Sequence, residues 1–447
     1  MTVDEQLQIL RRATTEIISE ADLRKKLESG RKLRVKLGVD PTAKDVTLGW
    51  AVVLRKLRDF QRCGHQAVLV VGDFTAQIGD PSGKSKTRKQ LTREEVQVNV
   101  DAVLTQFGKI LDLQTLEIRY NSEWLGTMGF VDVIRMCAKT TVARIMERDD
   151  FTKRWEAHQP ISMHELMYPL CQATDSVALK ADVELGGNDQ KFNNLMGRQL
   201  QEAEGQEPQT VVLSPLLVGT DGKEKMSQSL GNYVSIQDTP NDMFGKTMSI
   251  PDDLIRNWFE LCTDVPMKYV SALCDNADSL RLNPRDLKRR LACHIVDLYH
   301  PSEPPAEKEL WLEGGLPGLH KDGKVWYQST NSFVMGTGPN GEELMGSFGH
   351  KAVEADTYFR QTFSKRQQPV EAEEKAIPAE LGGEFPLASL IGLLGMTKSN
   401  GEARRMIEQG GVSLDGTKVS DAQIKVLRSD VVGKVLRVGK HQFAKLA

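Results

Sequence analysis

The sequence predicts an α/β fold with a doubly wound parallel sheet, followed by a helical domain and a small α+β domain at the C-terminus. Two observations support this prediction. Apolar runs of strand length alternate with amphipathic helical patterns through the first 235 residues, which is the rhythm of parallel strands joined by helices. One run, AVLVV, is apolar without interruption, as expected of a strand covered on both faces.

The first half of the chain supplies most of the predicted sheet. Residues 3–30 have a charged amphipathic pattern and are expected to form one helix. A short strand is expected at 33–37, and apolar residues at helical spacing predict a helix that begins at Leu48 and is closed by Gly64. The strand AVLVV, a helix over about 93–111 and the strand TLEIRYN complete a β-α-β-α-β series.

The second half begins with a helical pattern that runs from Met163 through HELMYPLCQATDSVALK. The stretch ADVELGGNDQKFNNLMGRQLQEA predicts a strand, a turn and a helix, and TVVLS predicts a strand that leads into a polar loop. Residues 240–300 have helical patterns with few strand signals. From about Phe385 the chain again predicts a compact unit of helices and short strands.

These patterns divide the chain into four parts. Residues 1–235 are expected to form the α/β domain, 236–304 a helical domain and 384–447 the C-terminal domain. The segment 305–383 is rich in Gly and Pro, which predicts either a linker with a small β-rich insertion or disorder. Within it, KVWYQSTNSFVMG is expected to contribute a hairpin strand.

The composition limits the class of protein. The 447 residues are 40% hydrophobic and 27% charged with a formal net charge of −3, which is typical of a soluble globular protein. A nucleic-acid site in such a chain must be a local basic patch. The six cysteines show neither a CxxC pair nor zinc spacing, which favours free thiols in a reducing cytoplasm and predicts no protein-bound metal. No run approaches the ~20 apolar residues of a membrane span.

Polar loops that contain glycine follow the predicted strands. They lie at 38–42 and at 72–80, and Asn121 ends the next strand. Ligands of doubly wound sheets bind at the carboxyl ends of the strands, so we expect a binding site where these loops meet. The helix that opens on Leu48-Gly49 also has a glycine at the turn where a phosphate approaches backbone in nucleotide sites.

Two further stretches identify a family. KEKMSQSLGN, at 223–232, resembles the KMSKS loop of class I aminoacyl-tRNA synthetases, and DVTLGW, at 45–50, lies where those enzymes carry the HIGH motif. GDFTAQIGDPSGKSKTR, RYNSEWL and YPLCQATDSVALKADVELGGNDQKFN all resemble tyrosyl-tRNA synthetases of the bacterial type. The tail resembles a small RNA-binding domain shared with a ribosomal protein. The resemblance covers nearly the whole chain, with 301–383 its poorest part.

The resemblance implies a Rossmann-like catalytic domain, a helical tRNA-binding domain and an RNA-binding C-terminal domain. The implied reaction is attack of the tyrosine carboxylate on the α-phosphate of ATP, followed by transfer of the tyrosyl group to tRNA. ATP with Mg²⁺, tyrosine or a related amino acid, and tRNA are the implied ligands, and a cytoplasmic homodimer is the implied state. Such chemistry depends on positioning and charge stabilisation rather than on a protein nucleophile.

On the amino-acid side, the resemblance assigns contacts with the substrate ammonium to Asp80, Tyr168 and Gln172. Asp175 matches the residue that reads the tyrosine hydroxyl, and a buried carboxylate in that role discriminates strongly against phenylalanine. Tyr168, Gln172 and Asp175 have the spacing i, i+4 and i+7, so one helix face presents all three. The resemblance also implies substrate contacts at Gln190, Asn121 and Lys36.

On the nucleotide side, Lys225 is expected to stabilise the leaving pyrophosphate from a mobile loop rich in glycine and serine. With Thr47 and Trp50, it makes up the expected catalytic set. Further nucleotide contacts implied by the resemblance are Gly38, Asp40, Gly49, Gly187, Asp189, Met226 and Ser227. In the C-terminal domain, the expected RNA contacts are Lys398, Arg404 and Arg405.

Four residues depart from the family pattern. Thr47 and Trp50 stand where the family has histidines or a close polar equivalent that stabilise the phosphates as the bond forms. Each lost donor costs on the order of 3 kcal/mol, or roughly 10²–10³ in rate. Gln228 replaces the second lysine of the mobile loop, and Thr174 replaces an aromatic residue, which predicts a smaller pocket wall.

Three hypotheses therefore remain open from the sequence. The first is an ATP-dependent ligase that joins tyrosine to tRNA. The second is a divergent paralogue that activates another amino acid or makes aminoacyl-tRNA for a use outside translation, and the four departures favour it. The third is a non-catalytic protein that binds RNA or tyrosine. The intact Lys225-Met226-Ser227 and the complete substrate helix argue against the third.

Overall fold

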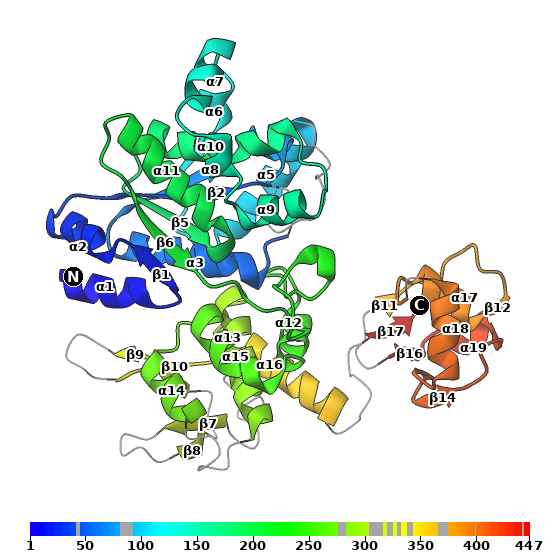
Figure 1. The fold of residues 1–447 in the computed structure, drawn as a ribbon. Helices are drawn as coiled ribbons and strands as arrows, with labels where there is room; N and C mark the ends of the chain where they lie inside the picture. Colours follow the sequence, from blue (N-terminus) through cyan, green and yellow to red (C-terminus); the bar gives the residue numbers. More distant parts are fainter. Residues whose placement is uncertain are drawn as a thin grey trace.

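The computed structural model describes residues 1–41, 45–80, 93–275, 283–303, 316–319, 325–328, 332–337, 343–364, 374–397, 399–439 and 442–447. Its first part is built on a six-stranded sheet with the order β1-β6-β5-β2-β3-β4 (Figure 1). The strands are β1 (Glu16–Ile18), β2 (Arg34–Val39), β3 (Gln66–Val71), β4 (Glu117–Tyr120), β5 (Val183–Gly187) and β6 (Thr210–Ser214). β2 to β6 run parallel, and β1 is antiparallel to β6. The predicted doubly wound α/β fold is confirmed.

Helices cover both faces of this sheet. Alternate side chains of β3 face opposite ways, so Leu69 joins the main core with α3 (Leu48–Arg62), whereas Val68 and Val70 pack with Leu179. The uninterrupted apolar run of β3 is therefore explained by burial on both sides. The other helices of this part are α4 (Thr75–Ile78), α5 (Arg93–Phe107), α6 (Ser122–Leu125), α7 (Phe130–Cys137), α8 (Val142–Ile145), α9 (Asp149–Glu156), α10 (Met163–Leu179) and α11 (Lys191–Ala203).

The prediction of a single N-terminal helix over 3–30 is wrong. The structure has α1 (Val3–Arg11) and α2 (Glu20–Glu28), and the edge strand β1 lies between them. Ala13 adopts a left-handed φ of 49°, which ends helical geometry, and the amide of Thr15 donates to the carbonyl of Leu213 on β6 at 2.8 Å. Pairing with the sheet edge thus outweighs the helical periodicity of this segment.

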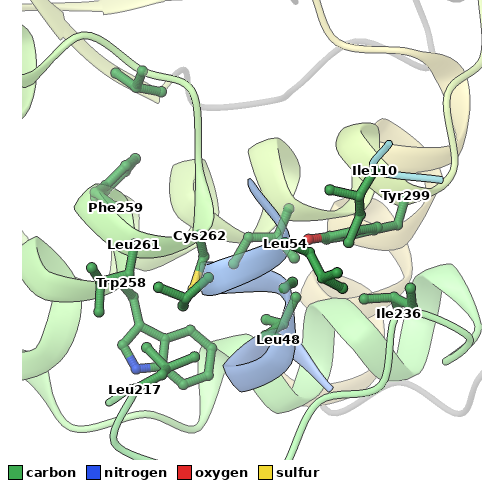
Figure 2. Packing of buried hydrophobic residues seen from close by; sticks show 14 of the residues in the cluster. Leu48, Leu54, Ile110, Leu217, Ile236, Trp258, Phe259, Leu261, Cys262 and Tyr299 are labelled. Atoms are coloured by element: carbon green, nitrogen blue, oxygen red, sulfur yellow. The ribbon is translucent and has the colours of Figure 1, made fainter. Parts of the chain in front are cut away.

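A helical part follows the sheet, as the sequence predicts for 240–300. It comprises α12 (Pro240–Met248), α13 (Ile255–Cys262), α14 (Met267–Asp275) and α15 (Pro284–Tyr299). Its core is continuous with that of the sheet. Figure 2 shows Leu48 and Leu54 of α3 beside Trp258 and Cys262 of α13 and beside Tyr299 of α15. Helix α3 therefore packs against both the sheet and the helical part, and its N-terminus follows the carboxyl end of β2.

The segment 305–383 contains two described hairpins and a helix. Strand β8 (Val325–Gln328) pairs with β7 (Leu316–Leu319), and β9 (Ser332–Thr337) pairs with β10 (Glu343–Ser347). KVWYQSTNSFVMG thus contributes to two hairpins. Helix α16 (His350–Phe359), which the sequence analysis did not predict, packs on α12 and α15 and continues into a short π-helical turn.

The C-terminal part has its own hydrophobic core. Its helices are α17 (Leu387–Leu393), α18 (Asn400–Glu408) and α19 (Arg428–Val431). Five strands form a sheet in the order β11-β17-β16-β13-β14, and β12 pairs with β15. The bounds are β11 (Glu374–Lys375), β12 (Glu384–Pro386), β13 (Val412–Leu414), β14 (Thr417–Val419), β15 (Lys425–Leu427), β16 (Val435–Val438) and β17 (Gln442–Leu446). Throughout the described part of the chain, no helix has the length and apolar character that a membrane crossing requires.

Candidate active site

The expected substrate residues gather at the carboxyl ends of β2, β3, β4 and β5. Helix α10 supplies three of them on one face, as the spacing predicts. Its start is fixed by Glu165, which accepts from the amide of Ser162 and is held by Arg154 through two hydrogen bonds of 2.9 Å. Arg154 and Glu165 are both buried, so this ion pair anchors the helix from which the site is built.

Tyr168 and Asp40 connect α10 to the end of β2. The Tyr168 hydroxyl donates to Asp40 Oδ2 at 2.8 Å, and the Thr75 hydroxyl donates to Asp40 Oδ1 at the same distance. Burial, with the charge of Asp40 beside it, raises the pKa of Tyr168 well above its ordinary value, so the phenol stays protonated. A Cβ at Gly72 would lie 2.0 Å from Asp40 Oδ1, so this position requires glycine.

Asp175 lies deeper, three residues beyond Gln172 on the same helix. It is buried and accepts a hydrogen bond of 2.8 Å from Trp124 Nε1. Burial raises its pKa from 3.8 to about 7, although the charge of Lys36 and hydrogen bonds from Trp124 and Asn121 lower it. A carboxyl group near its pKa at neutral pH is suited to exchange a hydrogen bond with a phenolic hydroxyl. Trp124 was not predicted as a site residue, although it lies in the family-like stretch RYNSEWL.

Asn121 and Lys36 support the site from behind. Asn121 donates to the Thr75 hydroxyl at 3.0 Å and accepts from the amide of Phe74, so it fixes the loop after β3. Lys36 is completely buried, and its Nζ donates to Glu184, to the Ser176 hydroxyl and to the carbonyl of Gln172 at 2.9–3.0 Å. An ammonium has three protons, so Lys36 has none left for a substrate.

Asp80 and two glutamines form the polar end of the site. Gln190 Nε2 donates to Asp80 Oδ2 at 3.1 Å. The Nδ2 atom of Asn193 donates to Gln190 Oε1 at 3.1 Å and to Gln172 Oε1 at 2.9 Å. A carboxylate and two amide oxygens thus come together from the loop after β3, from α10 and from the start of α11, which is a suitable set of acceptors for an ammonium.

Thr174 faces away from these residues. Its hydroxyl donates to the carbonyl of Leu170 at 2.8 Å and lies 3.2 Å from the sulfur of Met136 on α7. It is buried in the packing between α7 and α10.

The N-terminus of α3, where phosphate binding is expected, is covered in this structure. The amide of Leu48 donates to the carbonyl of Val234, and the amide of Gly49 donates to Met226 Sδ at 3.3 Å. Thr47 caps the helix by accepting from the amide of Trp50 at 3.3 Å. The indole of Trp50 is half-buried and packs against the main core. The first three amides of the helix are therefore all bonded within the chain.

The loop that carries Lys225 lies against this helix end. Lys225 Nζ forms an ion pair of 3.0 Å with Asp189 Oδ2. The side-chain amide of Gln228 donates to the carbonyl of Asp45, two residues before the helix cap. Asn232 accepts from the amide of Ser227 at 2.9 Å and closes the loop on itself. A phosphate reaches the helix amides only after Met226 moves away.

Two glycines flank the expected nucleotide side. A Cβ at Gly187 would lie 2.7 Å from Asp189 Oδ1 and 2.9 Å from Leu216, so a side chain does not fit there. Gly38 is exposed and has nothing within 4 Å of the corresponding position, so any ligand at the end of β2 meets bare backbone. Gly38 therefore suits close approach of a ligand to the main chain, whereas Gly187 is needed for the packing of Asp189 and Leu216.

The expected RNA contacts lie on α18. Arg404 and Arg405 are exposed, whereas Ala403 and Ile407 of the same helix are buried in the C-terminal core. The two arginines thus form the solvent face of an amphipathic helix. Lys398 lies outside the described residues.

Comparisons with known proteins agree with this geometry. Residues 28–309 match the family model described as tRNA synthetases class I (W and Y), and residues 387–432 match the S4 domain. The chain is 44% identical to the tyrosine–tRNA ligase of Moorella thermoacetica over 448 residues, which cover 99% of this chain and 96% of that protein. It is 45% identical to the tyrosine–tRNA ligase of Salinibacter ruber, with 99% and 97% covered.

Solved structures show the same fold over about two thirds of the chain. The tyrosyl-tRNA synthetase of Archaeoglobus fulgidus, complexed with L-tyrosine, has a TM-score of 0.56 at 24% identity and covers 67% of this chain and 98% of its own. That of Aeropyrum pernix has a TM-score of 0.55 at 22% identity, with 67% and 93% covered. The chain therefore belongs to the class I tRNA synthetase family of the W and Y type, and it carries an S4 domain after the synthetase part.

Proposed function

We propose that the chain is a tyrosine–tRNA ligase that activates tyrosine with ATP and transfers the tyrosyl group to tRNA. The observation that carries the proposal is the face of α10, where Tyr168, Gln172 and Asp175 are presented toward Asp40 and the Asp80 end of the site. Relatives named as tyrosine–tRNA ligases match over 99% of the chain. The synthetase family and the S4 domain match separate segments of the chain, which supports binding of tRNA by two parts of the protein.

Asp80, Gln172 and Gln190 hold the tyrosine ammonium in this proposal, with Tyr168 closing one side. Asp175 bonds the phenolic hydroxyl. Phenylalanine would leave Asp175 buried with one hydrogen bond unmade, and sites of this kind reject the analogue by roughly 10⁴–10⁵. Asn121 and Lys36 hold the surrounding loop and helix in place, as their bonds to Thr75, Glu184 and Ser176 indicate.

ATP lies between the N-terminus of α3 and the loop of Lys225 in this proposal, and it arrives as its Mg²⁺ complex. Gly38, Asp40 and Gly187 line the nucleoside side, with Asp189 nearby. When the loop opens, Met226 releases the amide of Gly49, and Lys225 exchanges Asp189 for the pyrophosphate. Ser227 moves with this loop. The step needs no proton transfer by the protein, because the attacking carboxylate of tyrosine is already ionised.

The departures at Thr47 and Trp50 favour a second candidate. A divergent paralogue that activates a different amino acid, or charges tRNA for another use, would tolerate a slower first step. The observation in its favour is that the α3 terminus is capped internally by Thr47, Met226 and Val234. Because all the residues expected on the amino-acid side are present, tyrosine remains the first substrate to test.

We also propose an RNA-binding surface and limits for the domains. We propose that Arg404 and Arg405, with Lys398, contact the phosphate backbone of tRNA. We propose a catalytic domain at 1–235, a helical tRNA-binding domain at 236–304, a Gly/Pro-rich linker or insertion at 305–383 and a small RNA-binding domain at 384–447. We propose a cytoplasmic location, where ATP and tRNA are found.

We also propose that the chain is a homodimer. Five apolar side chains on three successive helices are more than half exposed: Phe130, Val131 and Ile134 of α7, Val142 of α8 and Trp155 of α9. Exposed apolar groups of this size gathered on neighbouring elements typically mark a protein interface. A dimer in sedimentation analysis that Phe130→Asp converts to monomer would support this surface, and an unchanged dimer would exclude it.

Tyrosine-dependent exchange between ATP and labelled pyrophosphate tests the function. The native protein is compared with a variant that combines Thr47→His and Trp50→His. Exchange by the native protein with tyrosine supports the ligase. No exchange with tyrosine, together with exchange in the histidine variant, supports the altered paralogue and calls for a screen of other amino acids. No exchange in either protein, with any amino acid, contradicts both enzymatic hypotheses.

A further inference from the structure

Two buried residues outside the expected substrate set lie behind its polar end. Arg148 precedes α9 and has 4% of its surface exposed, and Asn193 lies in α11 with 1% exposed. Neither was expected from the sequence. Burying an arginine is costly unless its charge and its donors are matched, so its partners indicate its role.

The guanidinium of Arg148 contacts an acidic neighbour, an aromatic ring and residues at the polar end of the site. It donates to both carboxylate oxygens of Asp150 at 3.0 and 3.1 Å and lies 4.9 Å from the ring centre of Phe151. It donates to Asn193 Oδ1 at 2.9 Å. Its Nη2 atom also lies 3.9 Å from Asp80 Oδ1. Asp150 thus makes the shorter contacts with the guanidinium, and Asp80 lies beside the same cation.

Asn193 transmits the orientation of Arg148 to the substrate acceptors. An arginine only donates, so Asn193 must present its oxygen to Arg148 and its NH₂ group to the other side. That NH₂ group donates to the Oε1 atoms of Gln172 and Gln190. Both amide oxygens are thereby drawn toward one nitrogen, and the NH₂ of Gln190 is turned to Asp80.

The result is a closed ring of polar contacts: Arg148, Asn193, Gln190 and Asp80, with Gln172 attached at Asn193. Each carbonyl oxygen has two lone pairs, and Asn193 occupies one of them on each glutamine. Asn193 therefore fixes the orientation of both glutamine amides, and Gln190 in turn holds Asp80 Oδ2.

We infer that Arg148 is a positioning residue that acts through Asn193 to fix the three acceptors of the substrate ammonium. This inference rests on the proposed function, because it takes Asp80, Gln172 and Gln190 as the acceptors. Arg148 itself does not touch the substrate. Its removal should therefore weaken binding of the amino group specifically and leave binding of the phenol ring largely intact.

The test compares two ligands by calorimetry with the full-length protein. L-Tyrosine carries the ammonium, and 3-(4-hydroxyphenyl)propanoate lacks only that group. We expect Arg148→Met to weaken tyrosine binding by roughly tenfold or more, the effect of disturbing charge-assisted hydrogen bonds, and to change binding of the analogue by less than about threefold. Asn193→Ala should show the same selective loss. Arg148→Lys, which keeps a donor for Asn193, should recover part of the tyrosine affinity.

Arg154→Met is the matched control. Arg154 is similarly buried and has an equivalent bidentate bond to Glu165, and it lies in α9, the helix that Arg148 precedes. Its hydrogen bonds run to Glu165 and to the carbonyl of Pro160 and not to Asn193. We expect it to lower the melting temperature without a selective loss of tyrosine affinity. Parallel losses for both ligands in Arg148→Met and Asn193→Ala, or the same selective loss in Arg154→Met, would overturn the inference and leave the proposed function standing. Native protein that binds neither ligand would overturn both.

Discussion

Asp175 makes the stability of the folded chain fall as the pH rises, which is the reverse of the usual effect of a carboxylate. Burial raises its pKa from 3.8 to about 7. The folded chain therefore holds the proton more tightly than the unfolded chain, and folding takes up a proton between these two values. The stabilising contribution is fully present below pH 3.8 and is lost as the pH rises to 7 and above.

The size of the effect follows from the shift. A difference of about 3 pKa units, at ~1.36 kcal/mol each, corresponds to about 4 kcal/mol in full. The portion between pH 5 and pH 8 covers about two units, or roughly 2.7 kcal/mol. Asp175→Asn replaces the carboxyl group by a neutral amide of the same shape. Its oxygen still accepts from Trp124, so the variant has the hydrogen bond without the titration.

The assay is urea denaturation of the native protein and Asp175→Asn at several pH values from 5 to 8. Taking the difference between the two proteins removes the titration of every other group, including Asp264, whose pKa three arginines hold low. We expect the variant to gain roughly 2–3 kcal/mol relative to the native protein across this range. A difference that stays constant with pH would refute the reasoning, because it would mean that Asp175 is ionised at low cost.

Three further predictions concern the nucleotide side and the support of α10. Thr47→His with Trp50→His should raise the rate of pyrophosphate exchange by roughly 10²–10³ with tyrosine affinity unchanged, and a lower rate would show that the indole is required. Gln228→Lys removes the hydrogen bond from Gln228 to the carbonyl of Asp45 and supplies a second cation, so we expect a lower KM for ATP in the same assay. An unchanged KM would show that this hydrogen bond does not limit ATP binding. Lys36→Met leaves Glu184 buried without its counter-ion and should cost about 3–5 kcal/mol in urea unfolding, whereas a loss below ~1 kcal/mol would contradict the buried ion pair.

The sequence was sufficient for the elements whose periodicity is long and uniform. The apolar run of β3 and the amphipathic pattern of α3 predicted a buried strand and a helix that begins at Leu48, and the structure has both. The prediction for the N-terminal segment failed because its periodicity does not reveal that residues 15–18 pair with β6, which lies almost two hundred residues away in the sequence. Helix α16 was missed because the glycines and prolines around it dominate the composition of 305–383.

The candidate site likewise contains residues that the sequence could predict and residues that it could not. Spacing along α10 was enough to place Tyr168, Gln172 and Asp175 on one face, since three residues of one helix share a local geometry. Trp124 and Arg148 were out of reach, because their roles depend on contacts between segments that only the folded chain brings together. A buried arginine is visible in a sequence only as one of 58 lysines and arginines.

The most direct test of the central claim is aminoacylation of tRNA by the full-length native protein with labelled tyrosine, ATP and Mg²⁺, with phenylalanine in a parallel reaction. We expect tyrosyl ester to form on tRNA only when ATP is present, and we expect no detectable phenylalanyl ester. Charging with phenylalanine at a comparable rate would contradict the role of Asp175. No tyrosyl ester, in a protein that binds both tyrosine and tRNA, would contradict the ligase itself.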